Sequence, residues 1–162
     1  MKKLLYICFF FIFVSCGQID FVLDSDKKSI NPLYEKTDIN LGGKDIVFLK
    51  SYLPMFFGYN KGQKFELSIR VSEEQKKLSV ESNQATSNLG YELRFFYTLR
   101  SIDSDCITFK KEILSSFSII PKSSGFNYGT DSSLQKKYEL AVTDNLNQLL
   151  SYLSETNLYE CI

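Results

Sequence analysis

The residue types that support catalysis at neutral pH are scarce in this chain. Its 162 residues include four cysteines and no histidine, which removes the commonest general base and the usual partner of a Ser or Cys nucleophile. The adjacent carboxylates Glu73 and Glu74 fall in a charged run that predicts a solvated turn or bulge. No Cys-x-x-Cys spacing or clustered ligand set indicates a metal or redox centre. We therefore expect a binding protein, not an enzyme, with no cofactor and no metal.

The first residues have the pattern of an export signal. A short basic start, Met1-Lys2-Lys3, precedes an apolar run from Leu4 to Val14, which is too short for a transmembrane helix of roughly 20 residues. The run closes with Phe13-Val14-Ser15-Cys16, which resembles a bacterial lipobox, where the cysteine is lipidated and becomes the mature N-terminus. We predict a signal peptide over 1–15 and lipidation of Cys16. An ordinary cleaved signal, or a buried cysteine on an N-terminal helix, is the alternative.

Residues 16–30 are mostly polar and predict a lipid anchor and tether, so the folded domain is expected over 31–162. Acyl chains stabilise membrane attachment by roughly 0.8 kcal/mol per buried CH₂ group. Gly17, not Asp, follows the predicted lipidated cysteine. By resemblance to bacterial sorting signals, this indicates the outer membrane, with the domain on its periplasmic side.

Two cysteines remain in the predicted mature domain, Cys106 and Cys161. An exported protein meets an oxidising compartment, where paired cysteines form disulfides. A bridge would join the chain's tail to a predicted turn, and closing a loop of this length stabilises by roughly 4 kcal/mol. Two free thiols are the other interpretation.

Composition favours one domain with a substantial core, because 44% of the residues are hydrophobic and 15% aromatic. The 19 basic and 19 acidic residues balance. Loss of Lys2 and Lys3 with the signal leaves 17 basic residues, and a chain this close to neutral has no global field that attracts nucleic acid.

The stretch from Leu89 to Ile120 predicts a long antiparallel hairpin around a polar turn, because large apolar residues alternate with polar ones. Similar alternation predicts strands over 34–41 and from Gln63. Helical spacing predicts a helix over 45–57, with a buried strand as the alternative, and another from Asp131 to about Ser154. The expected fold class is α+β: a two-layer sandwich with an antiparallel sheet of four or slightly more strands and two helices on one face.

The predicted strands divide their side chains between two faces. The apolar set, expected to face the helices, is Tyr91, Leu93, Phe95, Tyr97, Leu99, Ile107, Phe109, Ile113, Phe117 and Ile119. The opposite face mixes charges with apolar residues, and a solvated face seldom needs the latter. Its candidate partner-binding residues are Arg70, Arg94, Phe96, Arg100, Lys110 and Leu114. A purely solvated sheet face is the alternative.

The order of elements resembles the LPS-assembly lipoprotein family, LptE. The likeness lies in the lipobox cysteine, in Ser79-Val80-Glu81-Ser82-Asn83-Gln84-Ala85 leading into Leu89-Gly90-Tyr91-Glu92-Leu93, and in Glu112 to Phe117 before the helix from Asp131 to Leu153. This resemblance implies an outer-membrane plug and scaffold inside the LptD β-barrel. It also implies contact with lipopolysaccharide through basic residues near two loops. Residues 82–87 carry none, and the second loop offers Lys122 as a ligand-binding candidate.

Two other function classes are the alternatives. An envelope lipoprotein of a transport system could bind a lipid or another apolar ligand among its 14 Phe and 10 Tyr residues, although aromatic residues at strand spacing are more often core. A lipid-anchored hydrolase would need a Ser/His/Asp or Cys/His set, which the sequence lacks.

Overall fold

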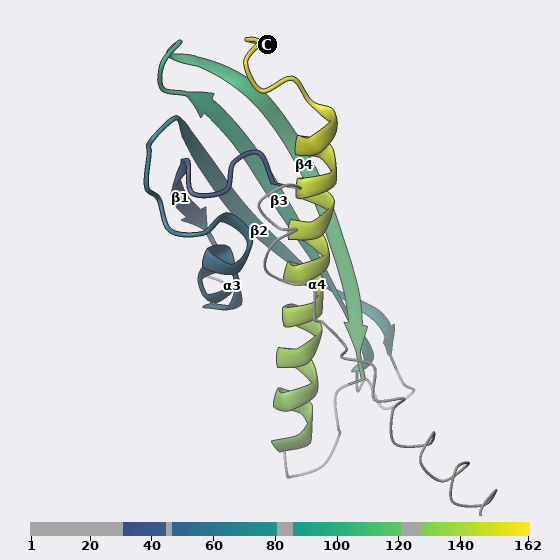
Figure 1. Cartoon of the computed structure of the whole chain (residues 1–162). Helices are drawn as coiled ribbons and strands as arrows, with labels where there is room; N and C mark the ends of the chain where they lie inside the picture. The colour runs from purple at the N-terminus through teal and green to yellow at the C-terminus, as the bar shows by residue number, and fades with distance from the viewer. Residues whose placement is uncertain (1–30, 45–46, 81–85, 121–127) are drawn as a thin grey trace, which may run out of the picture.

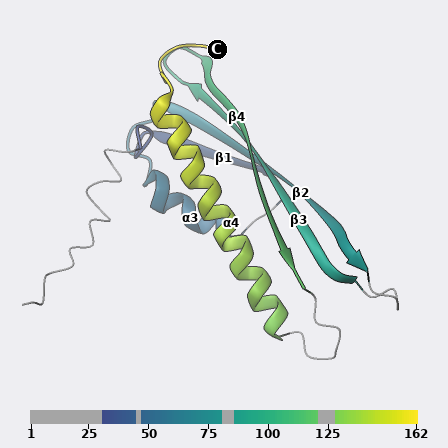
Figure 2. The same ribbon diagram turned by 90° about the vertical axis from the view of Figure 1, so that its right-hand side faces the viewer.

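The computed structural model describes residues 31–44, 47–80, 86–120 and 128–162, so the predicted signal peptide, anchor and tether lie outside the described residues. Its elements follow in the order β1 (Thr37–Gly43), α3 (Val47–Phe57), β2 (Phe65–Val80), β3 (Thr86–Ser101), β4 (Cys106–Ile119) and α4 (Tyr128–Glu155) (Figure 1). One four-stranded sheet carries α3 and α4 on the same face (Figure 2). The predicted two-layer α+β sandwich is therefore confirmed.

The sheet has the order β1-β2-β3-β4, and its first pair differs from the expected antiparallel arrangement. β1 runs parallel to β2, with Thr37 opposite Phe65 and Gly43 opposite Val71. The reason is the intervening helix, because a helical crossover returns the chain to the end from which it started. The β2–β3 and β3–β4 pairs are antiparallel, as predicted.

Helix α3, over Val47–Phe57, falls within the range 45–57 that helical spacing predicted, although Pro54 lies inside it. The helix ends at Gly58, whose amide donates to the Pro54 carbonyl oxygen at 2.9 Å. Gly58 has φ of 69°, the left-handed conformation in which glycine often ends a helix. A Cβ atom there would lie 2.9 Å from the Glu35 side chain, so the close approach also requires glycine.

The predicted charged turn around Glu73 and Glu74 is wrong, because β2 continues through it and pairs with β3 as far as Val80. Strand alternation directs the Glu73 side chain toward the helices, where it is only 6% exposed. Its carboxylate accepts a hydrogen bond from the Tyr138 hydroxyl at 2.7 Å and lies 3.6 Å from Lys44 Nζ. Burial and this carboxylate raise the pKa of Tyr138. Glu73 thus helps to hold α4 on the sheet.

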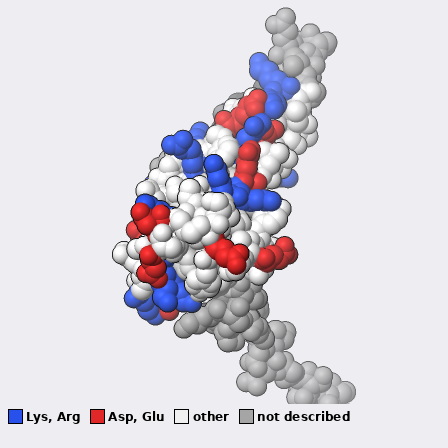
Figure 3. All heavy atoms as spheres, turned by 90° about the horizontal axis from the view of Figure 1, so that it is seen from above, with Lys and Arg blue, Asp and Glu red and all other residues white. Residues whose placement is uncertain are grey.

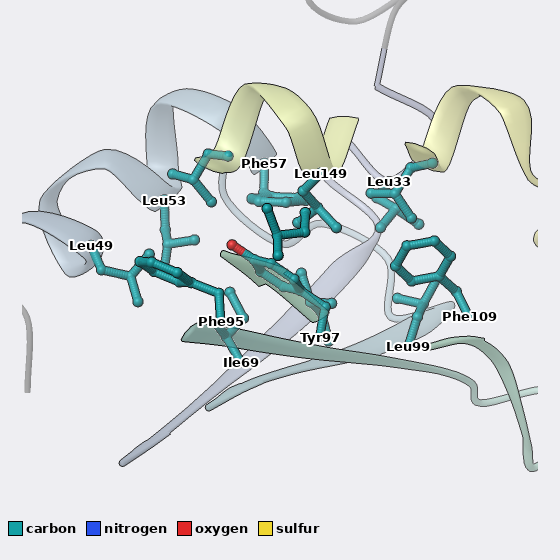
Figure 4. Packing of buried hydrophobic residues seen from close by; sticks show 14 of the residues in the cluster. Leu33, Leu49, Leu53, Phe57, Ile69, Phe95, Tyr97, Leu99, Phe109 and Leu149 are labelled. Carbon is teal, nitrogen blue, oxygen red and sulfur yellow. The ribbon is translucent and has the colours of Figure 1, made fainter. Parts of the chain in front are cut away.

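The core fills the space between the sheet and the two helices. Figure 4 shows its side chains pointing toward one another: Leu49, Leu53 and Phe57 from α3, Leu149 from α4, and Phe95, Tyr97 and Leu99 from β3. The buried Tyr97 hydroxyl donates to Asn145 Oδ1 at 2.5 Å, and Asn145 Nδ2 donates to Ser115 Oγ at 2.8 Å. Burial raises the pKa of Tyr97. This polar chain connects α4 to both hairpin strands at a specific register.

A β-bulge near the start of β4 changes which side chains face the core. Leu99 lies opposite Phe109 and Arg100 opposite Ile107, so Thr108 is an extra residue. Such an insertion shifts the alternation by one residue. Ile107 was predicted on the buried face, but the bulge places it on the other face, where it is 41% exposed.

The Cys106–Cys161 disulfide is present, with a Cα–Cα distance of 5.8 Å. It attaches the tail that follows α4 to the start of β4. The Ile162 amide also donates to the Ile107 carbonyl oxygen at 2.9 Å. The C-terminal residues are therefore held against the hairpin at two adjacent points.

Candidate functional site

The candidate site is the sheet face opposite the helices, which we call the open face. It consists of the side chains of β2, β3 and β4 that alternate with the core residues. All six residues predicted to contact a partner lie on it and are exposed: Arg70, Arg94, Phe96, Arg100, Lys110 and Leu114. The two helices anchor the strands from behind, so this face is presented by a rigid support.

The centre of the open face carries two apolar side chains among charged ones. Phe96 lies between Arg70 on β2 and Glu112 on β4, and the next row places Arg94 opposite Leu114. Phe96 is 38% exposed and Leu114 53% exposed. They occupy diagonal positions on neighbouring strands, a spacing that large side chains can bridge. The arrangement resembles the small apolar centre and polar rim of protein interfaces.

Next to this centre, four charged side chains form a connected network. Arg94 donates to Glu92 from Nε at 2.8 Å and from Nη2 at 2.5 Å, and it approaches Glu74 to 4.0 Å. Lys76 lies 3.3 Å from Glu74 and 3.5 Å from Glu92. The hydrogen bond from Arg94 is the main reason that the pKa of Glu92 is lowered. Exposed pairs of this kind add little stability, so their main effect is to orient the side chains.

Two cations of the face have no such partner. Within the described ranges, neither Arg70 nor Lys110 makes a hydrogen bond or an ion pair. Each can therefore bind a carboxylate or a polar surface of another molecule without breaking an internal contact. Arg100 differs, because its guanidinium group pairs with Asp105 in the hairpin turn.

The open face also contains a shallow hollow of about 440 Å³ beside the hairpin turn. Its lining residues come from all three long strands and from the turn: Glu66, Ser68, Thr98, Arg100, Asp105 and Ile107. Sequence reasoning named only Arg100 of this set as a site residue. The residues of this set on β2 and β3 alternate with core residues in the sequence, which is a pattern that could have identified them. Ile107 lines the hollow only because of the bulge.

A second hollow of about 360 Å³ lies toward the other end of the sheet, where its lining includes Leu78, Gly90 and Tyr91. Of the other site predictions, Cys16 and Lys122 lie outside the described residues. Within the parts of the chain that are described, no group of three His, Cys, Asp or Glu side chains could hold a metal ion. None of the helices described is long and apolar enough to span a membrane.

Comparison with known proteins gives a likeness of fold. No family model matches the sequence, and no curated protein matches it significantly. A candidate lipoprotein from Caulobacter crescentus CB15 is 12% identical with a TM-score of 0.57, over 81% of this chain and 94% of that one. Rare lipoprotein B from Shewanella oneidensis is 9% identical with a TM-score of 0.51, over 72% and 96%. Uncharacterized lipoprotein B from Nitrosomonas europaea is 10% identical with a TM-score of 0.52, over 76% and 87%. The chain therefore has a fold that is found among bacterial lipoproteins.

Proposed function

We propose that the mature chain is an outer-membrane lipoprotein that acts on the periplasmic side as plug and scaffold for the LptD β-barrel in lipopolysaccharide assembly. Cys16 would carry the lipid anchor. The fold likeness to bacterial lipoproteins, rare lipoprotein B among them, supports the lipoprotein part of this proposal. The single observation that carries the plug role is the open face, with its two unpaired cations and its apolar centre at Phe96 and Leu114.

The chemistry of the open face fits the inside of a barrel. The lumen of a transmembrane β-barrel is polar, so a plug needs interspersed charges and hydrogen-bonding groups on the surface that meets it. The face offers both signs of charge in neighbouring rows, from Lys76 through Glu92 and Arg94 to Arg70. A rigid partner surface also loses little conformational freedom on binding. The helices and the core provide that rigidity.

In this proposal the barrel is the direct partner, and contact with lipopolysaccharide is secondary. Residues 82–87 contain no Lys or Arg, so that loop offers no cation to a phosphate group. Scaffolding needs no such contact, and it needs no catalytic group either. The unpaired Arg70 and Lys110 are available to carboxylates of the barrel wall.

The test is purification of the tagged, full-length lipoprotein from membranes in a mild detergent, followed by mass spectrometry of the proteins that accompany it. A large outer-membrane barrel in stoichiometric amount supports the proposal. The matched control is an Arg70→Glu, Lys110→Glu double variant, which reverses both unpaired charges on the open face and leaves the core unchanged. Recovery of the wild-type protein without a barrel, as a monomer that carries bound lipid, would instead support the ligand-binding alternative.

A further inference from the structure

One end of the sheet gathers segments that are far apart in sequence. We call it the turn end: Phe65 at the start of β2, Ser101 at the end of β3 and Cys106 at the start of β4 lie side by side there. Thr37 at the start of β1 pairs with Phe65, and its hydroxyl donates to the Leu33 carbonyl oxygen at 3.0 Å. This end is uppermost in Figure 1, and the C-terminus lies beside it.

Exposed apolar side chains accumulate at the turn end. Ile102 and Ile107 flank the hairpin turn, and both are more than 40% exposed. Tyr59, Tyr159 and Ile162 each expose about three quarters of their surface. Figure 3 views the molecule from this end and shows uncharged atoms at the centre, with both signs of charge interspersed around them.

Backbone contacts place these residues at the turn end. The Ile102 amide donates to the Lys64 carbonyl oxygen at 2.9 Å, so the turn abuts the start of β2. In the loop that carries Tyr59, the Lys61 amide donates to the Glu35 carbonyl oxygen, also at 2.9 Å. Both contacts lie within three residues of a strand that begins at this end.

The disulfide closes a loop and also holds exposed apolar side chains of the tail at the turn end. Tyr159 and Ile162 lie on either side of Cys161, and the disulfide binds this short tail to Cys106. The Tyr159 ring lies beside the ring of the core residue Phe65, with 6.1 Å between the two ring centroids. The bridge acts together with two other contacts of this segment, the buried side chain of Leu158 and the hydrogen bond from the Ile162 amide to Ile107.

The charges near these side chains are mixed. Lys36, Lys61 and Lys64 are exposed at the turn end, and the acidic groups Asp103 and Glu160 accompany them. Tyrosine and lysine beside aliphatic residues are typical of protein surfaces at a membrane–water interface. There the tyrosine ring and the lysine alkyl chain lie in the apolar layer, while the hydroxyl and ammonium groups reach water. Lys61 is neutralised by its ion pair with Glu35 at 2.7 Å, so the remaining two cations and two anions balance. Such a surface suits a phospholipid layer of low net charge.

Chain length keeps this same end within reach of the membrane if Cys16 is lipidated, the one point at which the inference rests on the proposed function. Asn31, the first residue described, adjoins the turn end through Leu33. Fourteen residues lie between it and Cys16, a distance of at most about 50 Å when fully extended. The opposite end of the sheet is farther away by the length of the 16-residue β2 strand, again about 50 Å.

We propose that the turn end lies on the phospholipid surface beside the lipid anchor, with Tyr59, Ile102, Tyr159 and Ile162 entering the headgroup layer. Only the turn end meets lipid in this arrangement, so most of the open face stays accessible to a protein partner. The disulfide fixes the tail in this membrane-facing position.

The chain contains no tryptophan, so the fluorescence of a single introduced tryptophan reports on that position alone. Tyr159→Trp and Tyr59→Trp place it on two separate segments of the turn end, and Leu78→Trp is the matched control at the far end. The full-length lipidated protein is reconstituted into vesicles of phosphatidylethanolamine and phosphatidylcholine, which carry no net charge, with brominated acyl chains. Fluorescence at 159 and 59 should fall, because apolar groups at a membrane interface lie about 5–10 Å into the boundary between headgroups and acyl chains. Fluorescence at 78 should not change.

A lipidated protein whose tryptophans at 159 and 59 are not quenched would overturn the inference, and so would equal quenching at 78. The same two tryptophans are then measured in a Cys106→Ser background. Loss of quenching at 159, with quenching at 59 retained, would support the role of the disulfide. The proposed function is judged separately, by acyl labelling of Cys16 and by barrel co-purification. A failure of the proposed function can therefore be distinguished from a failure of lipid contact at the turn end.

Discussion

Two adjacent phenylalanines test the division between the core and the open face. Phe95 is fully buried against the helices, whereas Phe96 is 38% exposed on the open face. Phe95→Ala should lower the free energy of unfolding by about 3–5 kcal/mol through lost packing and the cavity that remains. Phe96→Ala should lower it by about 1 kcal/mol or less, because the side chain is partly exposed and lies outside the core.

The effects on partner binding should be reversed. A phenylalanine side chain buries about 200 Å², so the exposed part of Phe96 offers about 75 Å² to a partner. At about 25 cal/mol per Å² this corresponds to roughly 2 kcal/mol, or about 25-fold in affinity. Urea unfolding measures the first quantity and titration against the purified barrel partner the second. If Phe96→Ala unfolds the domain, or binds as tightly as wild type, our assignment of the open face is refuted.

Three further predictions address the anchor, the disulfide and the charge network. Cys16→Ala should abolish acyl labelling and release the protein from the membrane fraction, and unchanged labelling would refute lipidation. Cys161→Ser should lower the free energy of unfolding by about 4 kcal/mol, from the loop entropy of a 55-residue separation, and urea midpoints that match wild type would contradict this. Arg94→Ala should raise the pKa of Glu92 toward its ordinary value in an NMR titration, because the hydrogen bond from Arg94 holds that pKa down. In the wild type, the stabilisation from this pair is present above the ordinary glutamate pKa and is lost as the pH falls through the lowered value. An unchanged Glu92 titration in the variant would show that Arg94 is not the cause.

Alternation along the strands predicted most of the open face correctly, because side chains of neighbouring strand residues point in opposite directions whatever the tertiary context. Arg70, Phe96 and Leu114 could therefore be assigned to one face in advance. The assignment failed at Ile107, where the bulge at Thr108 shifts the alternation. A bulge depends on how two strands pair, and no residue in this turn specifies it.

Glu73 shows a second kind of failure. Its position between charged neighbours predicted exposure to solvent, yet its carboxylate is buried. Tyr138, 65 residues later in the chain, and Lys44, 29 residues earlier, both contact it. A buried carboxylate is stable only with such partners. The sequence around Glu73 does not contain them, so the local pattern predicted the wrong environment.

The sequence by itself determined the class of the fold, the hairpin and the α4 helix, because periodicity is a local property. It favoured a helix for α3 and a bridge for the two cysteines, but left a strand and free thiols open. Only the tertiary structure decided the parallel direction of β1, the exposure of Ile107 and the burial of Glu73. It also decided that the tail, the hairpin turn and the start of the domain meet at one end of the sheet. The reason is that these features depend on contacts between segments distant in sequence, and such contacts form only when the whole core has packed.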